Sequence, residues 1–190
     1  MLLPVNRDAA VDVAGDPPAF VRVLVPFEYA YPVDHLIRAL KFRGERVYAR
    51  VLGTLLAQAH QAVRHELPDL IVPMPLHSMR YRERGFNQAQ EIARFAARRL
   101  GVGVDTRSLL RRVATQEQSG LSVLERRKNV RGAFEAVRSL RGRRVALVDD
   151  VLTTGSTALA ASTALMEAGA AEVELWAVAR VVLNVRSAEC

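Results

Sequence analysis

Residues 145–157 most constrain the fold, because an apolar strand runs there into two acids and then a glycine turn that opens a helix. The four residues 145–148 are all apolar, as expected of a strand buried on both faces. A helical pattern follows over 156–168 and ends at Gly169. A buried strand that leads directly into a helix favours an α/β chain with a mostly parallel sheet and helices on both faces.

The rest of the chain alternates in the same way. The apolar runs and helical periodicities predict strands at 20–25, 69–73 and 173–182, and helices at 32–40, 47–65 and 87–100. The polar, arginine-rich stretch 112–131 is too long for an ordinary connection, and such stretches are often lids or binding loops. We therefore expect a flexible leader (1–19), an N-terminal cap or hood with helices (20–66), a core (67–182) and a tail (183–190).

Composition narrows the class of protein. A chain of 190 residues, half of them hydrophobic, fits one globular domain and excludes a mostly disordered protein. The single cysteine, Cys190, excludes an intrachain disulfide framework and a multi-cysteine zinc site. The first nineteen residues carry four charges, so a signal peptide is not expected, and no stretch is apolar enough to span a bilayer. We expect a cytoplasmic protein with no membrane partner.

The positive charge is carried almost entirely by arginine. Only Lys41 and Lys128 are lysines among 27 basic residues, so arginine supplies the other 25, and the formal net charge is +7. An arginine-rich codon usage explains most surface positions. The charge is compatible with polyanionic partners, either nucleic acid or phosphorylated metabolites, and does not choose between them.

The acids and the turn after the strand have complementary chemistry. The turn offers hydroxyls and helix N-terminal amides, which suit a phosphate, at Thr153, Thr154, Gly155, Ser156 and Thr157. Asp149 and Asp150 would repel a phosphate but can accept hydrogen bonds from the vicinal hydroxyls of a ribose. Ligands of open parallel sheets bind beyond the carboxyl ends of the strands. The segment thus predicts a sugar-phosphate site; the structural alternative is a threonine helix cap beside solvated acids.

These residues resemble the phosphoribosyl-pyrophosphate signature of type I phosphoribosyltransferases, and the wider chain resembles the ComF (competence protein F-like) family within that group. Further segments carry the resemblance, at 36–44, 71–76 with 82–88, 115–122 and 126–134. It implies a type I phosphoribosyltransferase fold, with a mostly parallel central sheet flanked by helices and a small N-terminal cap. Many ComF-like proteins begin with a cysteine-rich zinc ribbon. This sequence has no CxxC, so zinc is not expected.

The resemblance also assigns roles to residues. Asp149 and Asp150 become the catalytic acids that hold the ribose hydroxyls. The turn, from Thr153 to Thr157, holds the 5-phosphate. A pyrophosphate loop follows the earlier strand, with Arg82, Arg84, Gly85 and Phe86. A flexible loop that closes over the substrate contributes Gln118, Arg126, Arg127, Lys128 and Asn129.

The implied reaction is transfer of the phosphoribosyl group from phosphoribosyl pyrophosphate to a nitrogen acceptor, a base or another amine, with release of pyrophosphate. Magnesium is expected to arrive bound to the pyrophosphate. The alternative is a non-catalytic DNA-uptake accessory that binds single-stranded DNA or competence proteins. The few aromatic residues argue against a dedicated single-strand platform. The identity of the acceptor and a homodimeric state are left open.

Overall fold

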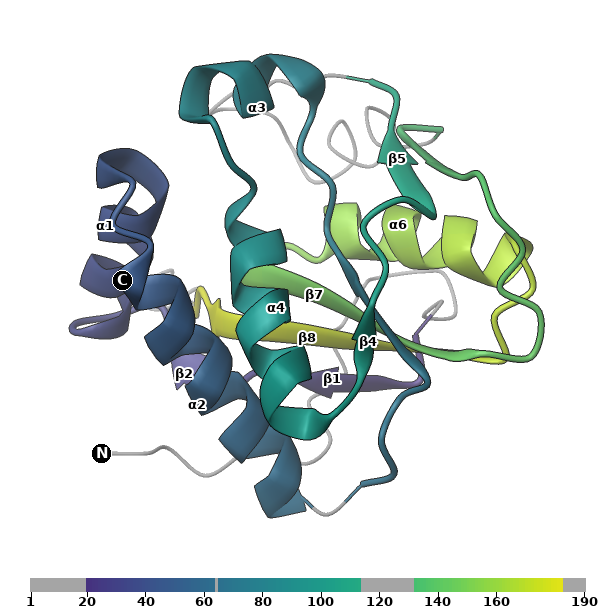
Figure 1. Ribbon diagram of the computed structural model, residues 1–190, viewed down its shortest axis with the longest axis horizontal. Helices are drawn as coiled ribbons and strands as arrows, with labels where there is room; N and C mark the ends of the chain where they lie inside the picture. Colours follow the sequence, from purple (N-terminus) through teal and green to yellow (C-terminus); the bar gives the residue numbers. More distant parts are fainter. Residues whose placement is uncertain (1–19, 64, 114–131, 183–190) are drawn as a thin grey trace, which may run out of the picture.

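A parallel sheet forms the centre of the molecule (Figure 1), which the computed structural model describes over residues 20–63, 65–113 and 132–182. Within these ranges the strand order is β1-β8-β7-β3-β4, with β2 also paired to β8, and every pairing is parallel. The strands are β1 (Arg22–Leu24), β2 (Phe27–Glu28), β3 (Leu70–Pro73), β4 (Gly103–Val104), β7 (Arg144–Leu152) and β8 (Glu172–Arg180). A separate antiparallel pair joins β5 (Leu109–Arg111) to β6 (Phe134–Ala136).

Helices cover both faces of the sheet, as Figure 1 shows. They are α1 (Val33–Arg43), α2 (Val47–Val63), α3 (Ser78–Arg84), α4 (Gln88–Leu100) and α6 (Ser156–Glu167). Helices α2 and α4 lie side by side on one face, and α6 lies on the other. The prediction of an α/β fold with a mostly parallel sheet and two helical layers is confirmed.

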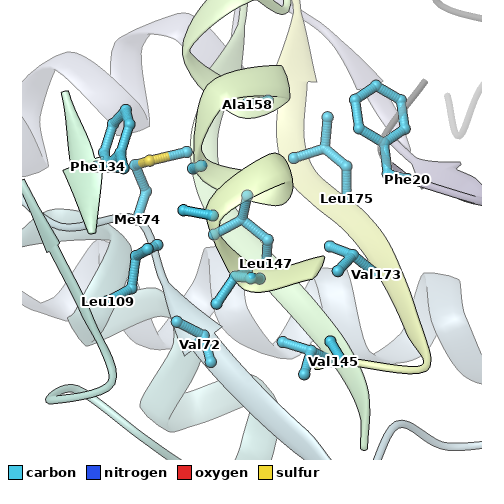
Figure 2. Packing of buried hydrophobic residues seen from close by; sticks show 14 of the residues in the cluster. Phe20, Val72, Met74, Leu109, Phe134, Val145, Leu147, Ala158, Val173 and Leu175 are labelled. Atoms are coloured by element: carbon cyan, nitrogen blue, oxygen red, sulfur yellow. The ribbon is translucent and has the colours of Figure 1, made fainter. Parts of the chain in front are cut away.

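Side-chain alternation along β7 divides the core into two clusters. On the α6 face, Val145 and Leu147 of β7 pack with Leu175 of β8, and Figure 2 shows this cluster extending to Met74 and Phe134. On the opposite face, Ala146 and Val148 pack with side chains of α1, α2 and α4, among them Ile37, Leu40, Leu52 and Ile92. Because both faces of β7 are buried, the four residues before its two acids, 145–148, are all apolar.

The contact between α2 and α4 depends on a glycine. A Cβ on Gly53 would lie 2.5 Å from the carbonyl oxygen of Ile92 and 2.8 Å from the Cβ of Phe95. Both distances are shorter than real Cβ contacts, and one involves the backbone. Gly53 therefore lets the two helices approach more closely than any side chain would allow.

The structure corrects the expected local pattern at two places. The strand does not end before the acids: β7 continues to Leu152, and Asp149 pairs in register with Ala177 of β8. Part of the expected loop at 76–86 is the helix α3, which begins after His77, whose side chain accepts the N–H of Met79, and ends at Gly85 with φ +76°. The short strands β2, β4, β5 and β6 were not predicted, because runs of two or three residues carry no periodicity.

Several predictions fall outside the described residues, namely the leader 1–19, most of the stretch 112–131 and the tail 183–190. Of the helices that the structure does describe, none combines the length and apolar character required to cross a membrane.

Candidate functional site

The acid pair lies in the second half of β7, toward the carboxyl end of the strand. Asp150 is buried, with 3% of its surface exposed, whereas Asp149 is partly exposed. The backbone N–H of Asp150 donates to Asp149 Oδ1 at 2.8 Å, so the two residues are held together. Asp150 follows Ala146 and Val148 on the face covered by α1, and it therefore points toward that helix.

Helix α1 supplies a cation to the acid pair, a contact that sequence reasoning missed. The Nζ of Lys41 lies 2.7 Å from Asp150 Oδ2, with 21% of the lysine side chain and 5% of the aspartate side chain exposed. Lys41 lies in the last turn of α1, where Ile37 and Leu40 anchor the helix in the core. A buried ion pair thus joins the N-terminal segment to the end of β7.

Among residues 20–63, 65–113 and 132–182, two carboxylates and one ammonium make up this group, so its charges are unequal in number. Burial, and then the negative charge of Asp150, raise the pKa of Asp149 to about 7. Burial by itself would lower the pKa of Lys41, but the charge and hydrogen bond of Asp150 outweigh it and raise the pKa above its ordinary value. Asp149 thus titrates near neutral pH, while Lys41 stays charged.

The turn after β7 places the predicted phosphate residues around the first turn of α6. Gly155 is the N-cap residue of the helix and has φ +75°, a conformation that glycine adopts without strain. The hydroxyls of Thr154 and Ser156 lie 3.2 Å apart, and Thr153 is exposed. No side chain caps α6, and its first turn contains no acidic residue. The helix N-terminus therefore keeps its partial positive charge without an internal counter-charge.

The segment expected to bind pyrophosphate brings its residues to three different environments. Arg84 donates to Gln88 Oε1 at 2.6 Å, and its guanidinium lies 5.7 Å from the ring of Phe42 on α1. Phe86 is buried in the core, 5.1 Å from the guanidinium of Arg46. Arg82 is exposed, and Gly85 ends α3. Phe86 therefore anchors the segment, whereas the arginines remain at the surface side.

A side-chain amide fixes this segment to the sheet. Asn87 is the N-cap of α4, where its Oδ1 accepts the N–H of Gln90, and its Nδ2 donates to the carbonyl of Met74 at 2.9 Å. Met74 directly follows β3, and its N–H donates to the carbonyl of Val148 on β7. The start of α4 and the end of β7 are thus connected through one short stretch of backbone.

The remaining predicted residues, Gln118, Arg126, Arg127, Lys128 and Asn129, lie outside the described residues. Sequence reasoning missed Lys41 and Phe42, which bring α1 to both sides of the site. Two signals pointed to Lys41: it lies in the segment 36–44 that carries the family resemblance, and it is one of two lysines in a chain whose other 25 basic residues are arginine.

Helix α1 also borders an open depression of about 490 Å³. Aromatic rings, cations and one carboxylate line it, from Tyr31, Asp34, His35, Arg38, Phe42 and Arg43.

Residues 85–182 match the family model of the phosphoribosyl transferase domain. Among characterised proteins, the DNA utilization protein YhgH of Salmonella typhimurium is 35% identical over 170 residues, which cover 87% of this chain and 75% of that protein. Competence protein F of Haemophilus influenzae is 35% identical over 171 residues, covering 86% and 74%. Competence protein ComFC of Bacillus subtilis is 28% identical over 153 residues, covering 76% and 58%.

Solved structures of phosphoribosyltransferases are also similar to this chain. The adenine phosphoribosyltransferase of Leishmania tarentolae superposes with a TM-score of 0.48 at 12% identity, covering 88% of this chain and 94% of that one. The glutamine phosphoribosylpyrophosphate amidotransferase of B. subtilis gives a TM-score of 0.46 at 26% identity, covering 68% of this chain and 25% of that one.

Proposed function

The chain belongs to the ComF family of type I phosphoribosyltransferases, and from this premise we propose that it binds phosphoribosyl pyrophosphate and transfers the phosphoribosyl group to a nitrogen acceptor. The observation that carries the proposal is the continuous unit made by the end of β7, the turn and the start of α6. It presents two carboxylates next to an uncapped helix N-terminus, which matches the hydroxyls and the phosphate of one sugar phosphate.

The proposed roles follow from the placement of the side chains. Asp149 and Asp150 accept hydrogen bonds from the ribose hydroxyls, and the turn from Thr153 to Thr157 binds the 5-phosphate through its amides and hydroxyls. In the reaction, the bond between the anomeric carbon and pyrophosphate breaks, and a bond to the acceptor nitrogen forms. Positive charge then develops on the ribose ring, where the carboxylates would stabilise it. Arg82 and Arg84 would stabilise the departing pyrophosphate.

Magnesium fits this arrangement as a companion of the substrate. Within the described residues no group of three or more His, Cys, Asp or Glu side chains is present that could hold a metal ion. The oxygens of a diphosphate are hard ligands of the kind that magnesium prefers, and we propose that they hold the ion. Its chemistry would be to neutralise charge on the leaving pyrophosphate.

Thermal unfolding tests the proposal directly. Phosphoribosyl pyrophosphate with magnesium, at one hundred times its dissociation constant, is expected to stabilise the native protein by about 2.7 kcal/mol and so to raise Tm. Asp149→Ala/Asp150→Ala should abolish the rise. The matched control, Glu167→Ala/Glu172→Ala, removes two acids from other parts of the surface and should leave the rise unchanged. A wild-type protein whose Tm does not respond would contradict the proposal.

Catalysis needs its own assay, because binding alone does not show transfer. Pyrophosphate release, measured across a panel of bases and amines, is expected to appear with one acceptor class and to disappear in Asp149→Ala/Asp150→Ala. Binding without release for every acceptor would restrict the protein to a binding role.

A second candidate function is that of a non-catalytic accessory in DNA uptake. In that role the protein would bind single-stranded DNA or competence proteins. The specific observation in its favour is the names of the relatives, a DNA utilization protein and competence protein F. It predicts an affinity for single-stranded DNA that falls steeply with salt. A protein that does not bind single-stranded DNA at low salt would eliminate direct DNA binding.

The remaining assignments are proposals of the same kind. We propose residues 20–66 as the cap and 67–182 as the core, although β1 and β2 of the first segment join the main sheet. Three further points also stay predictions from the sequence: that the stretch 112–131 closes over the substrate, that the protein is cytoplasmic, and that it forms a homodimer.

A further inference from the structure

Lys41 occupies a position that neither the sugar-phosphate signature nor the matched domain includes. The domain match begins at residue 85, and the signature lies at 149–157. Nevertheless, Lys41 Nζ lies 2.7 Å from Asp150 Oδ2 and forms an ion pair that is largely shielded from solvent. Helix α1 is fixed around it, because Ile37, Ala39 and Leu40 are completely buried.

The residue type at position 41 is informative. Arginine supplies 25 of the 27 basic residues, so a position that needed only a positive charge would be expected to carry arginine. An ammonium is compact and holds one carboxylate oxygen as a point charge, whereas a guanidinium is planar and takes two oxygens side by side. The contact that Lys41 makes is of the first kind, because its Nζ lies 2.7 Å from one oxygen of Asp150, Oδ2.

The same end of α1 reaches the second half of the site. Phe42, the next residue, lies under the guanidinium of Arg84, at 5.7 Å from the ring centre. Helix α1 therefore contacts both the acid pair and the segment expected to meet pyrophosphate. A shift of α1 would disturb both contacts together.

We propose that Lys41 is a positioning residue of the sugar site, whose ammonium holds Asp150 Oδ2 so that Asp150 Oδ1 is presented to a ribose hydroxyl. The inference rests on the proposed function, since it needs the acid pair to bind the sugar. It adds that α1 belongs to the sugar site, and that a compact cation is required at its end. The pKa of Asp149 supports this interpretation, because burial and the charge of Asp150 raise it whereas the charge of Lys41 lowers it.

The test compares two sugar phosphates that differ by one hydroxyl. Ribose 5-phosphate and 2-deoxyribose 5-phosphate share the phosphate, but only the first has the vicinal hydroxyl pair. In titration calorimetry the wild-type protein is expected to bind ribose 5-phosphate about tenfold more tightly, the effect of one hydrogen bond to a charged group. Lys41→Met should reduce this ratio to about one and retain phosphate-dependent binding of both ligands. A Lys41→Met protein with the wild-type ratio would overturn the inference and leave the proposed function intact.

The controls separate positioning from charge and from folding. Arg43→Met removes one charge from the same turn of α1, where Arg43 lies 3.6 Å from Glu45 at the surface, and should keep the wild-type ratio. Loss of the ratio in Arg43→Met as well would show a general charge effect and contradict the inference. Lys41→Arg, which keeps the charge, should retain more of the ratio than Lys41→Met. A wild-type protein that binds neither sugar phosphate contradicts the proposed function, and the inference with it.

A double variant keeps the test valid if Lys41→Met does not fold. Lys41→Met/Asp150→Asn removes both charges, so that no buried ion is left without a partner. In the Asp150→Asn background, adding Lys41→Met should change the ratio less than twofold, because the ammonium has no carboxylate to hold. A further large loss would mean that Lys41 acts on the sugar by itself, which overturns the positioning role.

Discussion

Two charged groups on neighbouring strands differ in how fully their charges are matched. On β8, Glu174 accepts from Arg22 at 2.9 Å and from the indole N–H of Trp176 at 3.0 Å, so each carboxylate oxygen has a partner. On β7, the described part of the chain gives Asp149 and Asp150 one cation, the ammonium of Lys41. A matched group stabilises a fold, whereas a surplus of buried acid destabilises it and is retained where a ligand uses it.

The largest effect on stability is expected at the matched group. Glu174→Ala leaves the buried indole N–H of Trp176 without its acceptor and breaks the ion pair with the half-exposed Arg22. We expect the free energy of unfolding to fall by about 3 kcal/mol, measured by urea denaturation, with the Tm response to substrate retained. A free energy of unfolding close to that of the wild type would show that the contacts of Glu174 with Arg22 and Trp176 do not stabilise the sheet.

The surplus acid should give the next largest effect, through pH. Because the folded pKa of Asp149 is about 7 against an ordinary value of 3.8, the native state binds more protons than the unfolded state between these values. Stability should therefore fall as pH rises from about 4 to about 7, by on the order of 2 kcal/mol for a partly exposed group. Asp149→Asn should remove this slope and the Tm response to substrate. If stability depends on pH in Asp149→Asn as it does in the wild type, a group other than Asp149 causes the dependence.

His60, whose ring lies beside Trp176 of the matched group, should respond to pH with the opposite sign and more weakly. His60 is buried, with its ring centre 4.6 Å from that of Trp176, and burial lowers its pKa below 6.5. The unfolded state then binds more protons as pH falls through 6.5, so this contribution to stability is lost on the acid side. His60→Phe retains an aromatic ring beside Trp176 and should remove the loss, measured as the change in Tm between pH 8 and pH 5. A greater acid loss in the variant would contradict the assignment.

The smallest effect is expected at the exposed edge of the matched group. The side chain of Arg22 is 44% exposed, so its ion pair is partly screened by solvent. Arg22→Met should lower the free energy of unfolding by about 0.5–1 kcal/mol, less in high salt than in low salt. A loss as large as that of Glu174→Ala would mean that the ion pair, rather than the indole hydrogen bond, dominates this group.

Sequence patterns predicted those parts of the molecule that are formed by residues close together in the sequence. The strands around Val72, Leu147 and Leu175 follow from apolar runs, and the acid pair and turn are contiguous in sequence. Lys41 could not be found in this way, because its contact with Asp150 depends on how α1 packs against the sheet. Helix α3 was missed because seven residues between a proline-rich stretch and Gly85 show no apolar face, and all its residues are at least partly exposed.

The pairing of β1 with β8 has a consequence for how the protein is made. Residues 22–24 pair with residues 174–176, so the first and last described strands of the sheet are neighbours. During synthesis β1 emerges from the ribosome well before β8, the strand with which it pairs. The sheet is completed only after β8 has been synthesised, and nascent chains that end before Glu172 leave the apolar edge of β7 uncovered. Truncated products should therefore be bound by chaperones or degraded rather than accumulate as folded fragments.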